Sequence, residues 1–193
     1  MAKKENVLVN SNKRLFYLSD NIDNETIAQL NFNLIYLLNE DDEKENEQKN
    51  YERTPIRLFI NSRGGNVYDM WSLIDIMLNS RTPIYTYCTG YAMSAAFQIF
   101  LAGSKRFTSN HATFLYHQSS GGMHGKYQDI IDYSKEEWEW VQNRVEEYVA
   151  SRTKITTEML KDNREHKKDW YIHTTEALHL GIATDNIENK TEV

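Results

Sequence analysis

Two residues of the chain, Ser94 and His117, have the types and positions needed for nucleophilic catalysis. Ser94 follows a strand-like stretch that begins after Pro83, and it precedes an apolar, helix-forming run over 95–103. A serine in this position is often a simple helix N-cap. His117 follows a second strand-like stretch, 113–116, and a histidine considered alone is usually structural. The pair favours catalysis, because imidazole is the usual base that takes the proton of a serine nucleophile.

A serine and a histidine of this kind also need a carboxylate, which fixes the imidazole tautomer and stabilises its charged form. The chain has 28 acidic residues, so the sequence alone does not choose among them. Asp169 stands out because it lies between the basic pair 167–168 and the apolar stretch 170–172, at the edge of something buried. A charge at a helix end explains the same position equally well. Asp169 is therefore a candidate for the third catalytic residue.

Attack on a carbonyl requires two backbone N–H groups that stabilise the oxyanion. Ala95 can supply one at the start of its helix, and Gly65, which follows the strand-like segment 56–60, can supply the other. Six of the eight glycines lie in three loops that follow predicted strands: Gly64 and Gly65, Gly90, and Gly121, Gly122 and Gly125. We expect Gly90 to form a tight turn. Ligands bind at the carboxyl ends of parallel strands, so we expect these loops to meet at one edge.

Strand and helix patterns alternate in the first part of the chain, which predicts an α/β fold with parallel pairing. We expect strands or extended segments at 14–18, 56–60, the stretch from 84, 106–108, 113–116, 169–172 and 182–187. We expect helices at 24–38, 67–79, 95–103, 127–152, a short one from 156 or 157, and 174–180. Residues 1–13 are polar and expected to be mobile or ordered only by a partner. The acidic run 40–50 predicts a solvated loop or a helix extension.

Composition limits the classes of function that the chain can have. With 193 residues, 40% of them apolar, the chain is expected to form one domain with a substantial core. A net charge of -6 argues against a nucleic-acid surface. The single cysteine, Cys88, excludes an internal disulfide and a cysteine-based metal site, and it fits a reducing cytosol. We predict no metal, no cofactor, no secretory signal and no membrane span.

Four segments resemble motifs of the ClpP family, the proteolytic subunits of the ATP-dependent Clp protease, over roughly 14–187. The residues that carry the resemblance are Ile60-Asn61-Ser62-Arg63-Gly64-Gly65, Gly90-Tyr91-Ala92-Met93-Ser94-Ala95-Ala96, Tyr116-His117-Gln118-Ser119-Ser120-Gly121-Gly122 and Lys168-Asp169-Trp170-Tyr171-Ile172. Arg63 stands where the family usually has proline. Each motif alone is weak, but together they are specific, and the chain is identified as a divergent member.

The resemblance implies a serine endopeptidase on a ClpP/crotonase-like α/β fold, a spiral of ββα units with a long handle helix. It implies a single domain, 1–193, with a head at about 14–117 and 168–193 and a handle at about 118–167. The implied catalytic residues are Ser94, His117 and Asp169, and the implied oxyanion hole is made by the backbone N–H groups of Gly65 and Ala95. The implied substrate-binding residues are Gly64, Asn66, Gly121 and Gly122.

The family's assembly is part of what the resemblance implies. Two seven-membered rings of identical subunits stack to form a tetradecamer that encloses the sites, and an AAA+ unfoldase supplies unfolded protein in the cytoplasm. No nucleic acid or membrane is involved. The short polar N-terminus and the charged stretch 40–53 bear on whether an unfoldase docks here. We expect an apolar face of the handle helix, including Trp138, Val141 and Val145, to form the contact between rings.

Three other readings compete with an active peptidase. The first is a catalytically silent or regulatory ring subunit with the same fold. The second is a crotonase-type acyl-CoA enzyme, which also uses two backbone amides but needs no serine nucleophile. The third is a Ser–Lys dyad like that of signal-peptide peptidases, which would give His117 no role. The serine and histidine together argue against the second and third, and labelling of Ser94 by a fluorophosphonate separates the first from an active enzyme.

Overall fold

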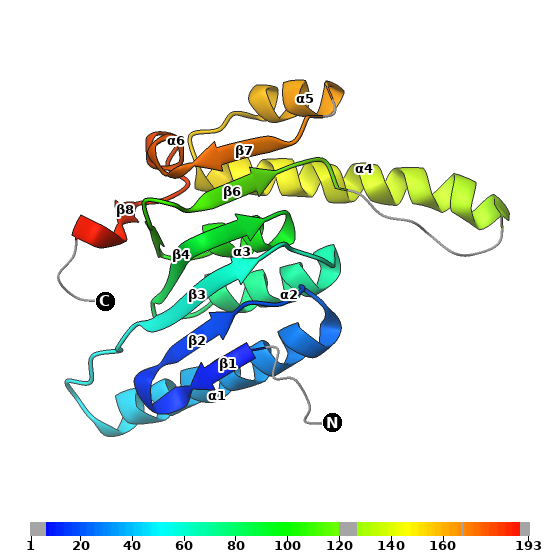
Figure 1. The fold of residues 1–193 in the computed structure, drawn as a ribbon. Helices are drawn as coiled ribbons and strands as arrows, with labels where there is room; N and C mark the ends of the chain where they lie inside the picture. The colour runs from blue at the N-terminus through cyan, green and yellow to red at the C-terminus, as the bar shows by residue number, and fades with distance from the viewer. Residues whose placement is uncertain (1–6, 120–126, 167, 190–193) are drawn as a thin grey trace, which may run out of the picture.

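The computed structural model describes residues 7–119, 127–166 and 168–189 of the chain (Figure 1). Its strands are β1 (Val7–Asn10), β2 (Leu15–Leu18), β3 (Ile56–Ser62), β4 (Ile84–Met93), β5 (Lys105–Thr108), β6 (Thr113–Tyr116), β7 (Trp170–His173) and β8 (Asp185–Asn186). Its helices are α1 (Asn24–Glu47), α2 (Val67–Leu78), α3 (Ala95–Leu101), α4 (Tyr127–Arg152), α5 (Thr157–Glu165) and α6 (Thr174–His179), with 3-10 turns at Ser11–Lys13 and Ile187–Asn189.

The strands form one mixed sheet in the order β1-β2-β3-β4-β5-β8, and β6 and β7 branch from β4. Neighbours from β2 to β5 are parallel, and the predicted parallel α/β fold is confirmed. The first half of β4 pairs with β5, whereas its last residues pair with β6. β7 then runs antiparallel to β6. The long strand β4 therefore brings the end of β6 beside its own end.

Helices α1, α2 and α3 lie together on one side of the sheet (Figure 1). α1 turns a row of apolar residues to the core at helical spacing: Ile27, Leu30, Leu34 and Leu37. Every residue of α3 is buried, so this short helix is the centre of the core. Cys88 is also in the core, as expected, and burial raises its thiol pKa to about 12. In the described part of the chain, no helix has the length and apolarity that crossing a membrane requires.

Two local expectations are wrong. The expectation that residues 1–13 are mobile or ordered only by a partner is wrong for Val7–Asn10, which pairs antiparallel with β2 and has Val7 buried, while residues 1–6 lie outside the described residues. Gly90 does not form a turn, because β4 continues through it to Met93. A side chain at Gly90 would collide with Asn61, whose Oδ1 accepts a hydrogen bond from the Tyr91 N–H at 3.1 Å. Glycine is needed there for close packing and not for a turn.

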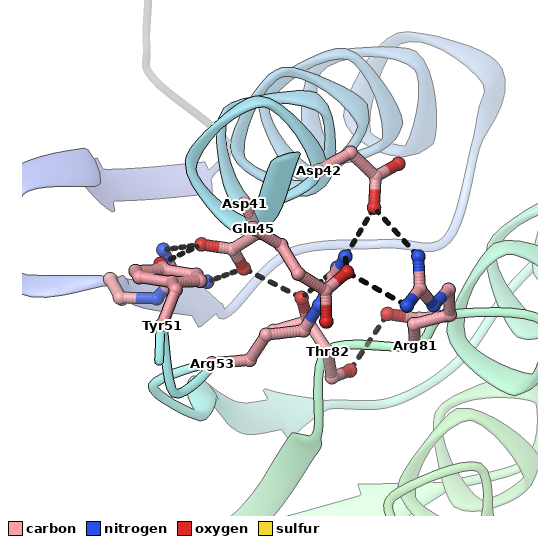
Figure 2. A network of polar contacts seen from close by, with 9 residues as sticks. Asp41, Asp42, Glu45, Tyr51, Arg53, Arg81 and Thr82 are labelled. Atoms are coloured by element: carbon pink, nitrogen blue, oxygen red, sulfur yellow. Dashed lines mark hydrogen bonds and ion pairs between the residues drawn. The ribbon is translucent and has the colours of Figure 1, made fainter. Parts of the chain in front are cut away.

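The acidic run 40–50 extends α1 to Glu47, but it is not simply a solvated face. Asp41 is fully buried and bonded on both oxygens (Figure 2). Its Oδ2 accepts from the Arg14 guanidinium and the Thr82 hydroxyl, each at 2.6 Å, and its Oδ1 accepts from the Tyr51 hydroxyl at 2.6 Å. Burial acts to raise the Asp41 pKa, but hydrogen bonds from Thr82, Tyr51 and Arg14 outweigh it and lower the pKa.

A second group of charged side chains lies beside Asp41 (Figure 2), and these side chains are 9% to 68% exposed. Arg53 donates to Asp42 and, at 2.6 Å, to Glu45, and Arg81 approaches Glu45 at 2.7 Å. These contacts join the end of α1 to the segments that precede β3 and β4. The acidic run therefore fastens a helix to the start of two central strands.

The long helix α4 occupies the residues that the sequence predicts, and its first turns extend beyond the sheet (Figure 1). The prediction that its apolar face forms the contact between rings is wrong for Val141 and Val145. Val141 and Val145 are 1% and 3% exposed within one chain, so they cannot also supply a contact surface for another copy. Both side chains are buried within one chain, where α4 packs against α3.

We predict that Asp41→Asn destabilises the fold by roughly 3–5 kcal/mol, because it leaves the Arg14 guanidinium, whose side chain is 13% exposed, without its carboxylate. Asp42→Asn, a matched change at a half-exposed side chain, should cost about 1 kcal/mol or less. Chemical denaturation measures both.

The difference between wild type and Asp41→Asn should also depend on pH. A carboxyl whose pKa is lowered on folding stabilises the fold above its unfolded pKa, about 3.9, and this stabilisation is lost as the pH falls towards the folded pKa. The two proteins should therefore converge in stability below about pH 4. Equal stabilities at pH 7 would contradict the assigned role of Asp41.

Candidate active site

A cavity of about 580 Å³ lies where β3, β4 and β6 end and where α2 and α3 begin. It gathers five residues that the sequence assigned to the site: Ser94, His117, Gly65, Ala95 and Asn66. The carboxyl ends of neighbouring parallel strands meet at this edge, as the positions of the glycine loops predict. The rest of the lining is mainly apolar or aromatic, with an arginine and a glutamate: Arg63, Val67, Tyr68, Met70, Gln98, Ser119, Glu137, Trp138 and Val145.

Ser94 has an unusual backbone conformation, with φ 53° and ψ -127°. Its side chain makes no capping hydrogen bond to α3, so the simple N-cap interpretation fails. Gly64 makes the conformation sterically accessible, since a Cβ there would lie 2.8 Å from the Ser94 Cβ and 2.6 Å from the Met93 carbonyl oxygen. Such strain costs on the order of 1–3 kcal/mol and is concentrated at functional sites. The strand-to-helix junction thus presents the Ser94 hydroxyl to the cavity.

His117 follows β6 directly, and β6 is held beside the end of β4. The register pairs Met93 with Leu115, and the Ser94 N–H donates to the Leu115 carbonyl at 2.9 Å. His117 is two residues beyond Leu115 and half-buried, and it lines the same cavity as Ser94. Backbone pairing therefore brings the predicted base to the predicted nucleophile, although they are 23 positions apart in sequence.

Asp169 lies near His117 in the sheet but does not line the cavity. The antiparallel register of β6 and β7 ends with Tyr116 opposite Trp170, so Asp169 and His117 are the next pair in line. Asp169 is exposed, and it forms no hydrogen bond or ion pair with any residue that the structure describes. The structure thus brings Asp169 to the correct edge of the sheet without joining it to His117.

The two predicted oxyanion donors both line the cavity, and the glycine pair lies beside the start of α3, since a Cβ added at Gly64 would be 2.9 Å from the Ala95 nitrogen. Ala95 is the first residue of α3, where backbone N–H groups have no partner within the helix. Gly65 forms an isolated parallel bridge with Ile22, in which the hydrogen bonds use the Gly64 carbonyl and the Asn66 N–H. Neither the Gly65 nor the Ala95 amide has an acceptor among residues 7–119, 127–166 and 168–189. Within the described part of the chain, both N–H groups are therefore without an acceptor, and both residues line the same cavity as Ser94.

The remaining predicted binding residues have different positions. Asn66 lines the cavity, but its side chain caps α2 by accepting the N–H groups of Tyr68 and Asp69. Gly64 lies behind Ser94, outside the cavity lining. Gly121 and Gly122 lie outside the described residues.

Sequence reasoning missed several polar groups in the cavity. The Tyr68 hydroxyl donates to Glu137 Oε1 at 2.6 Å and so joins α2 to α4. This bond, with burial, raises the pKa of Tyr68. Gln98 is buried in α3, where it is the only polar side chain of the helix, and Arg63 stacks over the Tyr91 ring at 5.7 Å. A glutamine in an otherwise apolar helix was a signal for Gln98, whereas the pairing of Tyr68 with Glu137 had none.

A buried chain of hydrogen bonds supports the segment around His117. The Ser119 N–H donates to Gln142 Oε1, and Gln142 Nε2 donates to the Tyr116 hydroxyl and to Glu146. Glu146, 2% exposed, also faces Arg164 of α5 at 3.4 Å. The residues on both sides of His117 are thus tied to α4 and α5. This network fixes the backbone that carries the predicted base.

The described part of the chain contains no candidate metal site. No group of three or more histidine, cysteine, aspartate or glutamate side chains there is arranged to hold a metal ion.

A strained serine, a histidine and two backbone amides without an acceptor in the described part of the chain line one cavity, and these are the groups that the sequence predicts for nucleophilic catalysis. The family comparison gives the class of the whole chain. The Clp protease family model matches residues 4–190, and the chain belongs to this family.

Curated relatives and a solved structure agree with this family. The chain is 28% identical over 172 residues to the ATP-dependent Clp protease proteolytic subunit 1 of Prochlorococcus marinus (strain MIT 9312), covering 88% of this chain and 82% of that protein. It is 29% identical over 176 residues to subunit 1 of Shouchella clausii (strain KSM-K16), covering 90% and 84%. A mutant of ClpP1 from Listeria monocytogenes superposes with a TM-score of 0.78 at 23% identity, covering 93% and 94% of the two chains.

We predict that Gly64→Ala disturbs the serine junction and lowers stability by roughly 2–4 kcal/mol. The added Cβ would meet three backbone or Cβ atoms at under 3 Å, at a φ of 99°. Gly181→Ala is the matched control, because φ is 70° there but the nearest atom is 3.6 Å away. It should cost about 1 kcal/mol. Equal melting temperatures for the two variants would show that Gly64 does not support Ser94.

Proposed function

We propose that the protein is a serine endopeptidase that cleaves peptides and unfolded proteins. The observation that carries the proposal is the strained Ser94, which shares one cavity with His117 and two unpaired backbone amides. Membership of the Clp protease family supports the same conclusion, since the named relatives are proteolytic subunits.

The proposed reaction assigns one step to each group. His117 takes the proton of the Ser94 hydroxyl as its oxygen attacks the carbonyl carbon of the peptide bond. The Gly65 and Ala95 N–H groups stabilise the negative charge that develops on the carbonyl oxygen. His117 then gives the proton to the leaving amine, and an acyl ester remains on Ser94. Water, activated by His117, hydrolyses this ester and frees the serine.

Asp169 is the proposed partner of the imidazolium, and its position suggests how activity could depend on assembly. It is next in register opposite His117, on the same strand face as Leu115 and Tyr171, yet Asp169 is exposed and its carboxylate has no bond to any described residue. Catalysis would require the Asp169 carboxylate to approach the His117 imidazole. We propose that contacts between copies supply this movement, in the region where the head, 14–117 and 168–193, meets the handle, 118–167.

Self-assembly is supported by an exposed apolar row on α1. Phe32, Ile35 and Tyr36 follow one another at helical spacing and are 73%, 45% and 57% exposed. Large apolar side chains clustered on one face indicate a contact surface. We propose that this face packs against a neighbouring copy in a ring, and that rings of seven stack in pairs around the sites. An AAA+ unfoldase as partner and a cytoplasmic location belong to the same proposal.

A catalytically silent or regulatory ring subunit is the second candidate. The observation that favours it is the missing hydrogen bond between Asp169 and His117. A silent subunit would not form a covalent adduct at Ser94 even when assembled.

We predict that a fluorophosphonate labels Ser94 in the assembled protein and that Ser94→Ala abolishes both labelling and peptide cleavage. Intact-mass spectrometry identifies the adduct, and a fluorogenic peptide reports cleavage. The substitution removes the nucleophile, so the rate should fall by about 10³-fold or more. Circular dichroism should show an unchanged fold. Turnover that survives in Ser94→Ala would exclude this serine as nucleophile.

We predict that Phe32→Asp reduces assembly, because it places a charge in an apolar contact. The side chain is largely exposed within one chain, so the fold itself should be retained. Leu78→Asp is the matched control, since Leu78 is also exposed, at 44%, but is the last residue of α2. Native mass spectrometry of the three proteins gives the assembly masses. An unchanged mass for Phe32→Asp would show that the α1 face is not a contact between copies.

A further inference from the structure

The cavity beside Ser94 contains a buried polar group that the proposed reaction does not use. Gln98 lines the cavity and is 4% exposed. Its backbone is satisfied, because its N–H bonds to the Ser94 carbonyl at 3.4 Å and its carbonyl accepts from the Tyr148 hydroxyl at 3.1 Å. Its side-chain Oε1, however, is buried without a hydrogen-bond partner in the described part of the chain. A buried acceptor in this state costs about 1–3 kcal/mol.

The position of Gln98 relates this group to the substrate. Gln98 lies in α3, four residues after Ser94, which directly precedes the helix, and both residues line the same cavity. The other cavity walls near it are apolar side chains of α2 and α4, including Met70, Trp138 and Val145. Such walls suit the unbranched stem of a side chain, and the amide offers that side chain one polar contact at its end.

We propose that Gln98 selects the substrate residue that supplies the cleaved carbonyl, and that this residue has a neutral side chain ending in a carboxamide, best represented by glutamine. An amide has an acceptor and donors, and a second amide can satisfy both kinds at once. This inference rests on the proposed function, because it takes Ser94 as the nucleophile. Beyond the proposed function, the inference specifies the chemical class of the substrate side chain that the cavity binds.

Charged side chains fit the same place less well. An ammonium or carboxylate brought against a neutral amide inside an apolar pocket would lose its hydration without a counter-ion. The two charged residues that line the cavity are already engaged: Glu137 accepts the Tyr68 hydroxyl, and Arg63 lies over the Tyr91 ring. Both are exposed, whereas Gln98 is buried. A neutral polar group is therefore the better complement.

The experiment uses four fluorogenic peptides that differ only in the residue before the cleaved bond: glutamine, methionine, glutamate or lysine. Methionine matches glutamine in length and lacks the amide. We expect kcat/KM for the glutamine peptide to exceed that for the methionine peptide by about tenfold in the assembled wild type, as one buried hydrogen bond allows. In Gln98→Met this ratio should fall to one or below. Gln48→Met, an exposed site at the end of α1, should keep the wild-type ratio.

Fluorophosphonate labelling of Ser94 in the same preparations tests the proposed function separately from the proposed role of Gln98. If wild-type Ser94 is not labelled, the proposed function falls and this inference falls with it. If Ser94 is labelled, but the glutamine peptide is not cleaved faster than each of the other three, the inference alone is wrong. A Gln98→Met protein that retains the wild-type preference for glutamine over methionine also overturns it.

Discussion

The strained junction at Ser94 is the constraint on which the rest of the site depends. A serine with φ 53° is tolerated because β6 fixes its N–H and the bare backbone of Gly64 packs against it. The cost of this conformation, about 1–3 kcal/mol, is offset by the packing of α3, all of whose residues are buried. The same junction frees the Ala95 amide at the helix start. One local conformation therefore sets the positions of the Ser94 hydroxyl and of the Ala95 N–H, a predicted oxyanion donor.

Pairing between strands that are distant in sequence places His117 at the same cavity as Ser94. β4 is long enough to pair with β5 and then with β6, which places His117 at the cavity. The buried network through Gln142 holds the residues on both sides of His117. Asp169 is held less firmly, since backbone register alone brings it near. The structure thus brings the predicted serine and histidine to one cavity, whereas the predicted third residue, Asp169, lies outside its lining.

The sequence predicted the fold class and the grouping of Ser94, His117 and Gly65, because strand patterns are local and parallel strands end at one edge. It misplaced features that depend on distant partners. The burial of Asp41 requires Arg14, Tyr51 and Thr82, which are separated from it by 10 to 41 positions. Pairing of β1 requires β2, and the need for glycine at position 90 arises from Asn61. Val141 and Val145 have an apolar pattern that does not reveal whether the partner is the same chain or another.

The central claim is that Ser94, His117 and the Gly65 and Ala95 amides act together on a carbonyl. The most direct test is an experimental structure of the assembled protein after reaction with a peptide boronate or phosphonate. The account predicts a covalent bond to Ser94 Oγ, with an adduct oxygen about 2.7–3.1 Å from both amide nitrogens. An intact protein that forms no adduct, or an adduct oxygen turned away from Gly65 and Ala95, would contradict it.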